Sequence, residues 1–293
     1  MWAIILHGGA KEIAPDEAEA NRSGCLRALS AGRAVLEGGG SALDAVEAAI
    51  RVLEDDPAFN CGYGSVLNAA GEVEMCAAIM EGESFNIGGV SIVQGVRNPV
   101  SVARAMLEEE TTLIAGPGAR AFAAEKGLEL CDPAALKASK DEQKRGRTGT
   151  HDTAGCVALD QHGLLVAGTS TRGLEDTPVG RVGDAALPGC GFYADNGLGA
   201  VAFSGDGEYI ARKMLAARVM HALGTQGPDE ALGLAIRHVA QIGGEAGGIA
   251  LTPDGRFGWM HNSREFAVAY ASSERPEPRV FLSKAEERVQ GGA

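Results

Sequence analysis

Residues 151–171 read HDTAGCVALDQHGLLVAGTST, two β-like runs separated by a short polar turn. The turn, Gln161-His162-Gly163, has the length and composition of a hairpin connection. Centring it on His162 places Thr153 opposite Thr171. Because a shift of one residue would turn every side chain to the other face of the sheet, this pairing is a specific prediction.

The segment before this hairpin differs in composition. Residues 137–150 carry many charged side chains and no large apolar one, which is typical of a solvated linker. The segment leads to Asp152-Thr153, where the first strand begins. It is either an ordinary surface loop or an accessible segment that precedes a processing site.

Apolar periodicity and turn residues predict the other elements. Ser41, with Asp44 three positions later, has the arrangement of a capping box at a helix start. Strands are expected at residues 2–6, 73–79, 87–94, 153–160, 164–171 and 200–204. Helices are expected at 16–37, from 41, at 99–108 and 117–126, from 207 to about 223, and at 229–242, with a final hairpin at 253–255. Helices in sequence pairs around clustered strands favour a layered α+β fold over an alternating parallel-sheet fold.

Composition excludes several classes of partner. The chain has 293 residues, and its 26 basic and 39 acidic side chains give a formal net charge of −13. This acidic excess argues against nucleic acid or an anionic membrane as a partner. Only four Tyr, two Trp and eight Phe are present, too few for an aromatic platform that stacks bases. The 42 glycines indicate tight turns or close approach of the backbone to a ligand.

Cysteine and histidine usage indicates an intracellular protein without a catalytic zinc ion. The six cysteines form no CxxC pair, and we interpret them as reduced core thiols rather than as a disulfide framework. The histidines lack the spacing of a zinc site. The N-terminal apolar run is too short for a signal peptide, and no stretch approaches membrane-spanning length. We therefore expect a soluble, cytoplasmic protein.

Thr153 is the first candidate for chemistry. A threonine hydroxyl is a poor nucleophile unless a base lies beside it, and one such base is the residue's own α-amine after cleavage of the preceding peptide bond. The Asp152–Thr153 bond joins the polar linker to a strand, where such a cleavage fits. In Thr169-Ser170-Thr171, the hairpin register brings a second hydroxyl within reach. The alternative is a threonine-rich strand pair that reflects β propensity alone.

Two further segments carry candidate binding groups. Arg181 and Asp184 stand on a glycine-flanked loop and would match the carboxylate and the ammonium of an amino acid, although a local salt bridge is the alternative. In Ser204-Gly205-Asp206-Gly207, backbone N–H groups and the Ser204 hydroxyl would stabilise an oxyanion. A phosphate cradle and a simple helix-start turn are the other interpretations, and the glycine spacing fits a dinucleotide fingerprint poorly.

These three segments and several others together resemble the plant-type asparaginase/isoaspartyl peptidase family. Its members are N-terminal-nucleophile hydrolases related to glycosylasparaginase, and the resemblance covers nearly the whole chain. The other matching segments are Leu6-His7-Gly8-Gly9-Ala10, Gly40-Ser41-Ala42-Leu43-Asp44-Ala45-Val46, Phe59-Asn60-Cys61-Gly62-Tyr63-Gly64-Ser65-Val66-Leu67-Asn68, Gly71-Glu72-Val73-Glu74-Met75 and Tyr193-Ala194-Asp195-Asn196.

The resemblance implies a fold and a maturation step. The fold would be a single domain, a four-layer αββα sandwich, made as an inactive precursor that cuts itself at Asp152–Thr153. Residues 1–152, with a mobile linker at about 132–152, and residues 153–293 would form the two subunits. The implied site comprises Thr153 as nucleophile, Thr171 as its assistant, Ser204 and Gly205 as the oxyanion hole, Arg181 and Asp184 with Gly205 and Gly207 around the substrate, and Asn60 near the nucleophile.

The resemblance also implies ligands and an assembly. The substrates would be β-aspartyl dipeptides and L-asparagine, with no cofactor for catalysis, and two processed heterodimers would associate. A structural sodium ion would be held by backbone carbonyls of residues 53–63. The implied sodium ligands are Leu53, Glu54, Asp56, Phe59, Cys61 and Tyr63.

Three positions depart from the family pattern. Ser204 stands where threonine is usual, Arg172 where glycine is common, and Cys76 where aspartate is frequent. His151 before the cleavage site resembles the glycosylasparaginase branch, whereas the His7-Gly8-Gly9-Ala10 start resembles the peptidase branch. A glycosylasparaginase-like amidase and a non-catalytic amino-acid-binding homologue are therefore the alternatives.

Overall fold

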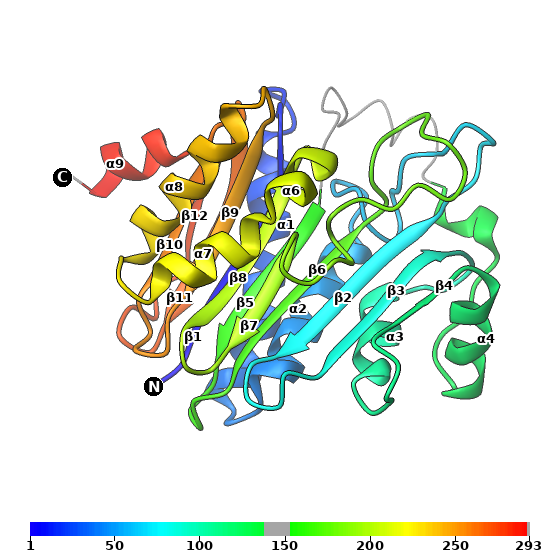
Figure 1. The fold of residues 1–293 in the computed structure, drawn as a ribbon, viewed down its shortest axis with the longest axis horizontal. Coiled ribbons are helices and arrows are strands. Elements are labelled where there is room, and N and C mark those ends of the chain that lie inside the picture. Colours follow the sequence, from blue (N-terminus) through cyan, green and yellow to red (C-terminus); the bar gives the residue numbers. More distant parts are fainter. Residues whose placement is uncertain (138–152, 292–293) are drawn as a thin grey trace.

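The computed structural model describes residues 1–137 and 153–291. In these residues two β-sheets lie face to face at the centre of the molecule (Figure 1). The larger sheet has the order β12 (Arg279–Phe281), β11 (Glu265–Ser272), β1 (Ala3–Lys11), β5 (Thr153–Leu159), β6 (Leu165–Thr171), β2 (Met75–Glu81), β3 (Ile87–Val93) and β4 (Leu113–Ala115). The smaller sheet has the order β10 (Phe257–His261), β9 (Ala246–Leu251), β8 (Gly199–Gly205) and β7 (Phe192–Asp195).

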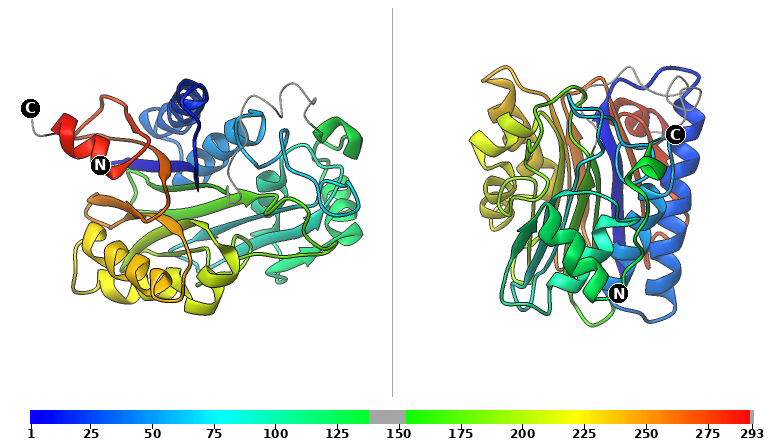
Figure 2. Two further views of the ribbon diagram at one scale, coloured as in Figure 1. Left: turned by 90° about the horizontal axis from the view of Figure 1, so that it is seen from above. Right: turned by 90° about the vertical axis from the view of Figure 1, so that its right-hand side faces the viewer.

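Helices cover the outer face of each sheet (Figure 2). The larger sheet carries α1 (Ala18–Glu37), α2 (Ala42–Glu54) and α3 (Pro99–Met106). The smaller sheet carries α7 (Leu215–Leu223) and α8 (Pro228–Ala240). The other helical segments are α4 (Pro117–Glu125), the 3₁₀ helix η1 (Pro133–Leu136), α6 (Gly207–Lys213) and α9 (Lys284–Gly291).

The apolar core is divided into three clusters by the two sheets. In β1, Ile4 packs into the cluster between the larger sheet and its helices, and Ile5 packs into the cluster between the two sheets. Val201 and Phe203 of β8 join the third cluster, with α7 and α8. Central strands that are buried on both faces require continuous apolar runs, which is why the sequence of β1 shows no polar alternation.

The hairpin of residues 153–171 has the predicted register. β5 and β6 are antiparallel, and Thr153 faces Thr171. The prediction is confirmed along the whole ladder, which ends with Leu159 opposite Leu165. The physical reason is the pattern of side chains: both strands are fully buried, and a shift of one residue would exchange the residues that face the two apolar clusters.

The opposite edge of β5 pairs with β1, and His7 faces Gly155 there. A Cβ atom on Gly155 would lie 2.2 Å from Nε2 of His7, so glycine is the residue that lets the two strands approach. The His7 ring is fully buried and lies 5.0 Å from the ring of Phe266. Burial lowers the pKa of His7 to about 3, so the ring is neutral at physiological pH.

The start of α2 is also as predicted. Ser41 is the N-cap, and its Oγ accepts a hydrogen bond of 3.1 Å from the backbone N–H of Asp44. The helix buries the predicted stripe, which comprises Leu43, Val46, Ile50 and Leu53. This side chain cap fixes where α2 begins, and the apolar stripe fixes which face meets the sheet.

Three expectations about elements are wrong in detail. The helix expected from 207 to about 223 is two helices, α6 and α7, because Met214 has a left-handed backbone (φ +50°). The first strand does not end at residue 6 but runs to Lys11 across an irregularity between His7 and Ala10. The hairpin at 253–255 joins β9 and β10, yet it is not the last element, because β11, β12 and α9 follow it.

The predicted linker is described only at its start. Of the linker that the family resemblance places at about 132–152, residues 133–136 form the 3₁₀ helix η1, in which Leu136 is buried. Residues 138–152, which include Asp152, lie outside the described residues. The six cysteines are free thiols. Among the described helices none has the length and apolar character needed to cross a membrane.

Candidate active site

Thr153 and Thr171 lie at one end of the β5–β6 ladder, where both line a small cavity. Both side chains are largely buried. The cavity has a volume of about 10 Å³, which is room for about one water molecule. Its lining residues are Thr153, Thr171, Gly173, Leu174, Arg181, Gly183, Asp184 and Gly205. The structure therefore brings five of the predicted site residues to one place, from two strands of one sheet, one strand of the other and the connection between β6 and β7.

The hydroxyl of Ser204 holds the backbone nitrogen of Thr153. Its Oγ accepts hydrogen bonds from the N–H of Thr153 at 3.1 Å and from the N–H of Ala10 at 2.9 Å. Ser204 is fully buried on β8, so it reaches across the space between the two sheets. The nitrogen that cleavage before Thr153 would free is thus already positioned by the opposite sheet. The oxyanion role of Ser204 and Gly205 stays a prediction.

The side chain of Arg181 is held by a carboxylate that the sequence reasoning did not assign. Its Nε and Nη2 donate to the two carboxylate oxygens of Glu208 at 2.9 and 2.7 Å. Its third nitrogen, Nη1, is not part of this ion pair and lies beside Gly173 and Gly183, which line the cavity. Glu208 follows directly on the Ser204–Gly207 segment, and no feature of the sequence shows that it would reach Arg181.

Asp184 is almost fully buried, and in the described part of the chain its Oδ2 makes no hydrogen bond. Burial raises the pKa of Asp184 to about 7, against the opposing effect of the Arg181 guanidinium. Gly207 keeps the space beside this carboxylate open, because a Cβ atom there would lie 2.8 Å from Oδ1 of Asp184 and 3.1 Å from Nη2 of Arg181. A buried acceptor next to a guanidinium is an arrangement that suits the ammonium and carboxylate of an amino acid.

Asn60 does not line the cavity but forms hydrogen bonds with the backbone of residues next to it. Its Nδ2 donates to the carbonyl of Gly173 at 2.6 Å, and its Oδ1 accepts from the N–H of Val66 at 2.9 Å. Its own carbonyl accepts from the N–H of Arg172 at 3.0 Å. These contacts position the residues after Thr171, and the expected place of Asn60 near the nucleophile stays a prediction.

The loop predicted to hold sodium folds back on the end of α2. The carbonyl of Glu54 accepts from the N–H of Tyr63 at 2.7 Å, and the carbonyl of Asp56 accepts from the N–H of Phe59 at 3.1 Å. Gly62 has a φ of +56°, which allows this tight return. Each carbonyl oxygen keeps a second lone pair, so the predicted backbone ligands remain compatible with a cation. Within residues 1–137 and 153–291, no cluster of three or more His, Cys, Asp or Glu side chains forms a metal site.

Glu54 is a buried acid behind the site that the sequence analysis did not assign to the catalytic centre. Its Oε1 accepts from Oγ of Ser170 at 2.7 Å and from the N–H of Val100 at 3.0 Å. Burial raises the pKa of Glu54 to about 8, because an ionised carboxylate would lose its hydration there. The carboxyl group is therefore neutral at pH 7 and links α2, α3 and β6.

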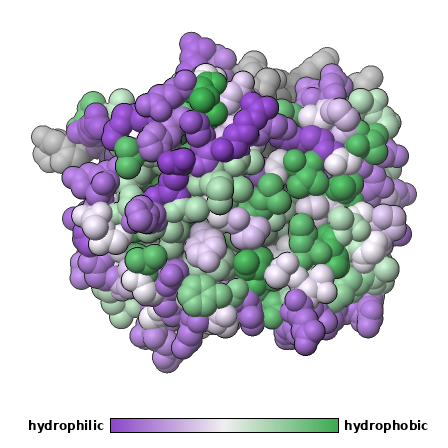
Figure 3. All heavy atoms as spheres, viewed as in Figure 1, coloured by the Kyte–Doolittle hydropathy of each residue, from purple (hydrophilic) through white to green (hydrophobic). Residues whose placement is uncertain are grey.

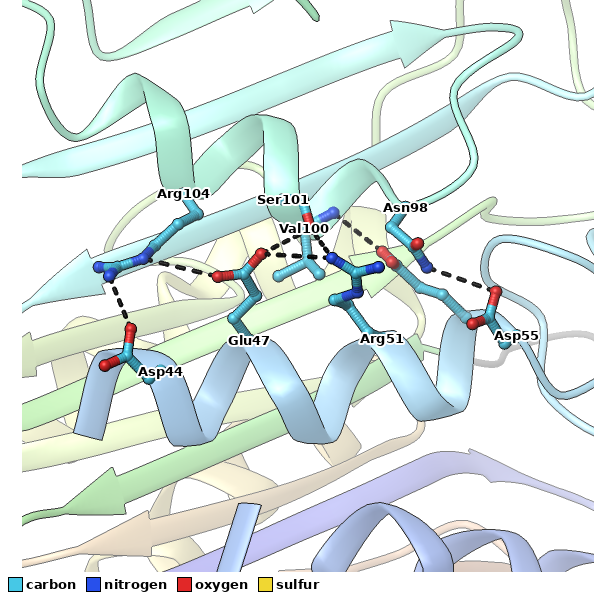
Figure 4. A network of polar contacts seen from close by, with 9 residues as sticks. Asp44, Glu47, Arg51, Asp55, Asn98, Val100, Ser101 and Arg104 are labelled. Atoms are coloured by element: carbon cyan, nitrogen blue, oxygen red, sulfur yellow. Dashed lines mark hydrogen bonds and ion pairs between the residues drawn. The ribbon is translucent and has the colours of Figure 1, made fainter. Parts of the chain in front are cut away.

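More exposed polar contacts connect the same helices (Figure 4). Glu47 accepts from Oγ of Ser101 at 2.6 Å, and Asp44 accepts from Nη2 of Arg104 at 2.8 Å. Such surface pairs contribute little stability each, about 0–1 kcal/mol. Of these contacts, the buried hydrogen bond between Ser170 and Glu54 is the one that joins the helices to strand β6.

Comparison with known proteins shows which family the chain belongs to. The model of the asparaginase family matches residues 1–279. The chain belongs to the asparaginase family. Several relatives of the chain are named isoaspartyl peptidase/L-asparaginase. The mouse relative is 40% identical over 98% of this chain and 92% of the relative. The rat relative is 40% identical over 85% of this chain and 79% of the relative, and the human relative is 38% identical over 91% of this chain and 92% of the relative.

The buried position of Glu54 makes the stability of a Glu54→Gln variant depend on pH in a defined direction. Because its pKa is about 8 in the folded chain and 4.5 without burial, the neutral carboxyl favours the folded state fully below pH 4.5, and this contribution is lost as the pH rises through about 8. Glutamine does not titrate. The melting temperature of Glu54→Gln, relative to the wild type, should therefore rise between about pH 5 and about pH 9.

Thermal unfolding of both proteins across this range checks the prediction. The exposed Glu110→Gln serves as the matched control and should show no such trend. A difference between Glu54→Gln and the wild type that is constant with pH would contradict the burial of a neutral acid at this position.

Proposed function

We propose that this chain is a threonine-nucleophile hydrolase that cleaves β-aspartyl dipeptides to L-aspartate and an amino acid, and L-asparagine to L-aspartate and ammonia. The observation that carries the proposal is the convergence of Thr153, Thr171, Arg181 and Asp184 on one small cavity. The names of the asparaginase-family relatives support the same activity.

The first step of the proposed mechanism is hydrolysis of the Asp152–Thr153 peptide bond. It consumes one water molecule and frees the α-amine of Thr153. The hydrogen bond from the N–H of Thr153 to Oγ of Ser204 supports this step, because it would hold the new amine in place. The amine would then take the proton of the neighbouring hydroxyl, as a threonine nucleophile requires.

In the second step Oγ of Thr153 attacks the side-chain carbonyl of the substrate. The leaving amine departs with a proton from the α-ammonium of Thr153, and an aspartyl ester remains on the enzyme. Water then hydrolyses the ester and releases L-aspartate. Ser204 and Gly205 would stabilise the negative charge on the carbonyl oxygen of each tetrahedral intermediate.

The α-end of the substrate would bind at Arg181 and Asp184. Nη1 of Arg181 lies beside the cavity wall and is available to the α-carboxylate while Glu208 keeps the other two nitrogens. Oδ2 of Asp184, which makes no hydrogen bond within the described residues, would accept one from the α-ammonium. Both substrates present the same aspartyl end, so they differ only in the leaving group.

We further infer the architecture and the assembly that go with this function. The two facing sheets with helices outside are consistent with a four-layer αββα domain of the N-terminal-nucleophile type, cut into residues 1–152 and 153–293. Hydrophobic residues gather over the middle and right of the face in Figure 3, and contiguous apolar surface of this kind is typical of protein interfaces. We propose a dimer of processed heterodimers in the cytoplasm, and sedimentation velocity checks the dimer.

A sodium ion would be held by the carbonyls of the loop after α2 and would stabilise the fold without acting in catalysis. No cofactor takes part in the proposed steps. Because a ligand that binds only the folded state raises stability, adding sodium chloride should raise the melting temperature more than the same concentration of choline chloride. Equal shifts with the two salts would contradict the sodium site.

Thr153 supplies both the nucleophile and the base, so Thr153→Ala should stay uncut and hydrolyse neither substrate. Gel electrophoresis and release of L-aspartate measure the two effects. Thr153→Ser is the matched control, because it keeps a hydroxyl and an α-amine and should retain some cleavage and turnover. A Thr153→Ala protein that is cut and active would disprove the mechanism.

The raised pKa of Asp184 predicts how product binding depends on pH. The ionised carboxylate accepts a charge-assisted hydrogen bond from the α-ammonium, which is much stronger than a bond to the neutral carboxyl group, and the pKa of Asp184 is about 7 in the folded chain. The inhibition constant of L-aspartate should therefore increase as the pH falls through about 7, by about tenfold for each unit below it. Asp184→Asn should bind L-aspartate more weakly and lose this pH dependence. Identical pH dependence in both proteins would remove Asp184 from its assigned role.

A further inference from the structure

Arg172 is a buried cation directly beside the site. It follows Thr171 at the end of β6 and is only 4% exposed. Its Nη1 donates to the carbonyl of Leu174 at 2.6 Å and to Oγ1 of Thr177 at 3.3 Å. Among the described residues its Nε and Nη2 have no hydrogen-bond partner. Burying a guanidinium with unused donors costs free energy unless an anion compensates its charge, so we expect a negatively charged ligand to bind this group.

The charges around Arg172 do not supply that anion. Glu74 and Glu175 are near enough to attract it, yet in the described ranges neither forms an ion pair with it, and Glu74 accepts instead from the N–H of Gly180 at 2.9 Å. Arg181 lies near enough to repel it. Arg181 is already paired with Glu208, whereas Arg172 forms no ion pair within the described residues. Arg172 does not itself line the cavity, but its uncompensated positive charge lies next to residues that do, and it favours a negative group near them.

The lining of the cavity indicates which part of the substrate meets this wall. Arg181, Gly183 and Asp184 surround the proposed α-end, and Thr153 and Gly205 surround the reacting carbonyl. The remaining lining residues are Thr171, Gly173 and Leu174. Arg172 lies between Thr171 and Gly173 in sequence, and its side chain is hydrogen-bonded to the carbonyl of Leu174. Since the α-end and the reacting carbonyl are placed elsewhere, the leaving group is the part of the substrate that would contact Thr171, Gly173 and Leu174.

We propose that Arg172 binds the terminal carboxylate of the amino acid that leaves from a β-aspartyl dipeptide. Nε and Nη2 form the edge of the guanidinium that grips a carboxylate with two parallel hydrogen bonds. L-asparagine has no carboxylate on its leaving group, so Arg172 acts on one of the two substrate classes only. It is a specificity-determining residue for isoaspartyl dipeptides with a free carboxyl terminus.

This inference rests on the proposed hydrolysis, and the test uses the processed wild-type enzyme with three substrates. These are β-aspartyl-leucine, the same dipeptide with a C-terminal amide, and L-asparagine. Since a hydrogen bond to a charged group contributes about 1.5–3 kcal/mol, kcat/KM should be about tenfold or more higher for the free acid than for the amide. Equal values for acid and amide in the wild type would overturn the inference without any variant.

The variant Arg172→Gln then assigns the preference to this side chain. It should lower kcat/KM for β-aspartyl-leucine to the value for its amide and leave L-asparagine unchanged, whereas Arg172→Lys should keep part of the preference. Arg256→Gln is the matched control, because Arg256 is exposed and pairs only with the nearby Asp254 within the described residues. The cleaved fraction and the melting temperature of each variant are measured alongside.

The outcomes separate a specificity role from a structural one. If Arg172→Gln lowers kcat/KM for all three substrates alike, or for none of them, Arg172 does not recognise the leaving group and the inference is wrong. A cut wild-type enzyme that hydrolyses none of the three substrates contradicts the proposed function. Hydrolysis of L-asparagine without any preference for the free acid contradicts only the role of Arg172.

Discussion

The antiparallel pairing of β5 with β6 is the constraint on which the site depends. It fixes Thr153 opposite Thr171, and the rest of β5 is held on its other edge by β1. Thr153 is the first residue of the strand, so a cut before it would leave both ladders intact. The freed nitrogen would stay where Oγ of Ser204 already holds it. A fold arranged in this way could lose the Asp152–Thr153 peptide bond without losing the position of Thr153.

Polar contacts on both sides of this ladder hold the residues of the candidate site. On the helix side, the neutral Glu54 accepts from Ser170, and Asn60 holds the carbonyl of Gly173. On the side of the second sheet, Arg181 is clamped by Glu208 and leaves one nitrogen for a ligand. Each of these contacts fixes a side chain or a backbone group before substrate binds. Such preorganisation lowers the cost of positioning the substrate.

The sequence predicted what local patterns control. The turn centred on His162 was sufficient for the register of β5 and β6, and Ser41 with its apolar stripe was sufficient for α2. Local reasoning also singled out Thr153, Arg181 and Asp184 as candidates, and the resemblance to the asparaginase family added support for their roles. Their roles stay predictions, although the structure places both loop residues on the same cavity as Thr153.

Contacts between distant segments were beyond prediction from sequence. Glu208 and Arg181 are separated by a strand pair, and no spacing rule links them. The interruption at Met214 depends on a backbone angle that ordinary helix propensity does not reveal. That Nε and Nη2 of Arg172 have no partner in the described part of the chain became visible only when its burial and its neighbours were known.

The central claim is that Thr153 becomes an N-terminal residue, and an intact mass spectrum of the purified wild-type protein tests it most directly. The account predicts two polypeptides, residues 1–152 and residues 153–293, with the second beginning at Thr153. A single chain of 293 residues that stays uncut on prolonged incubation would contradict it.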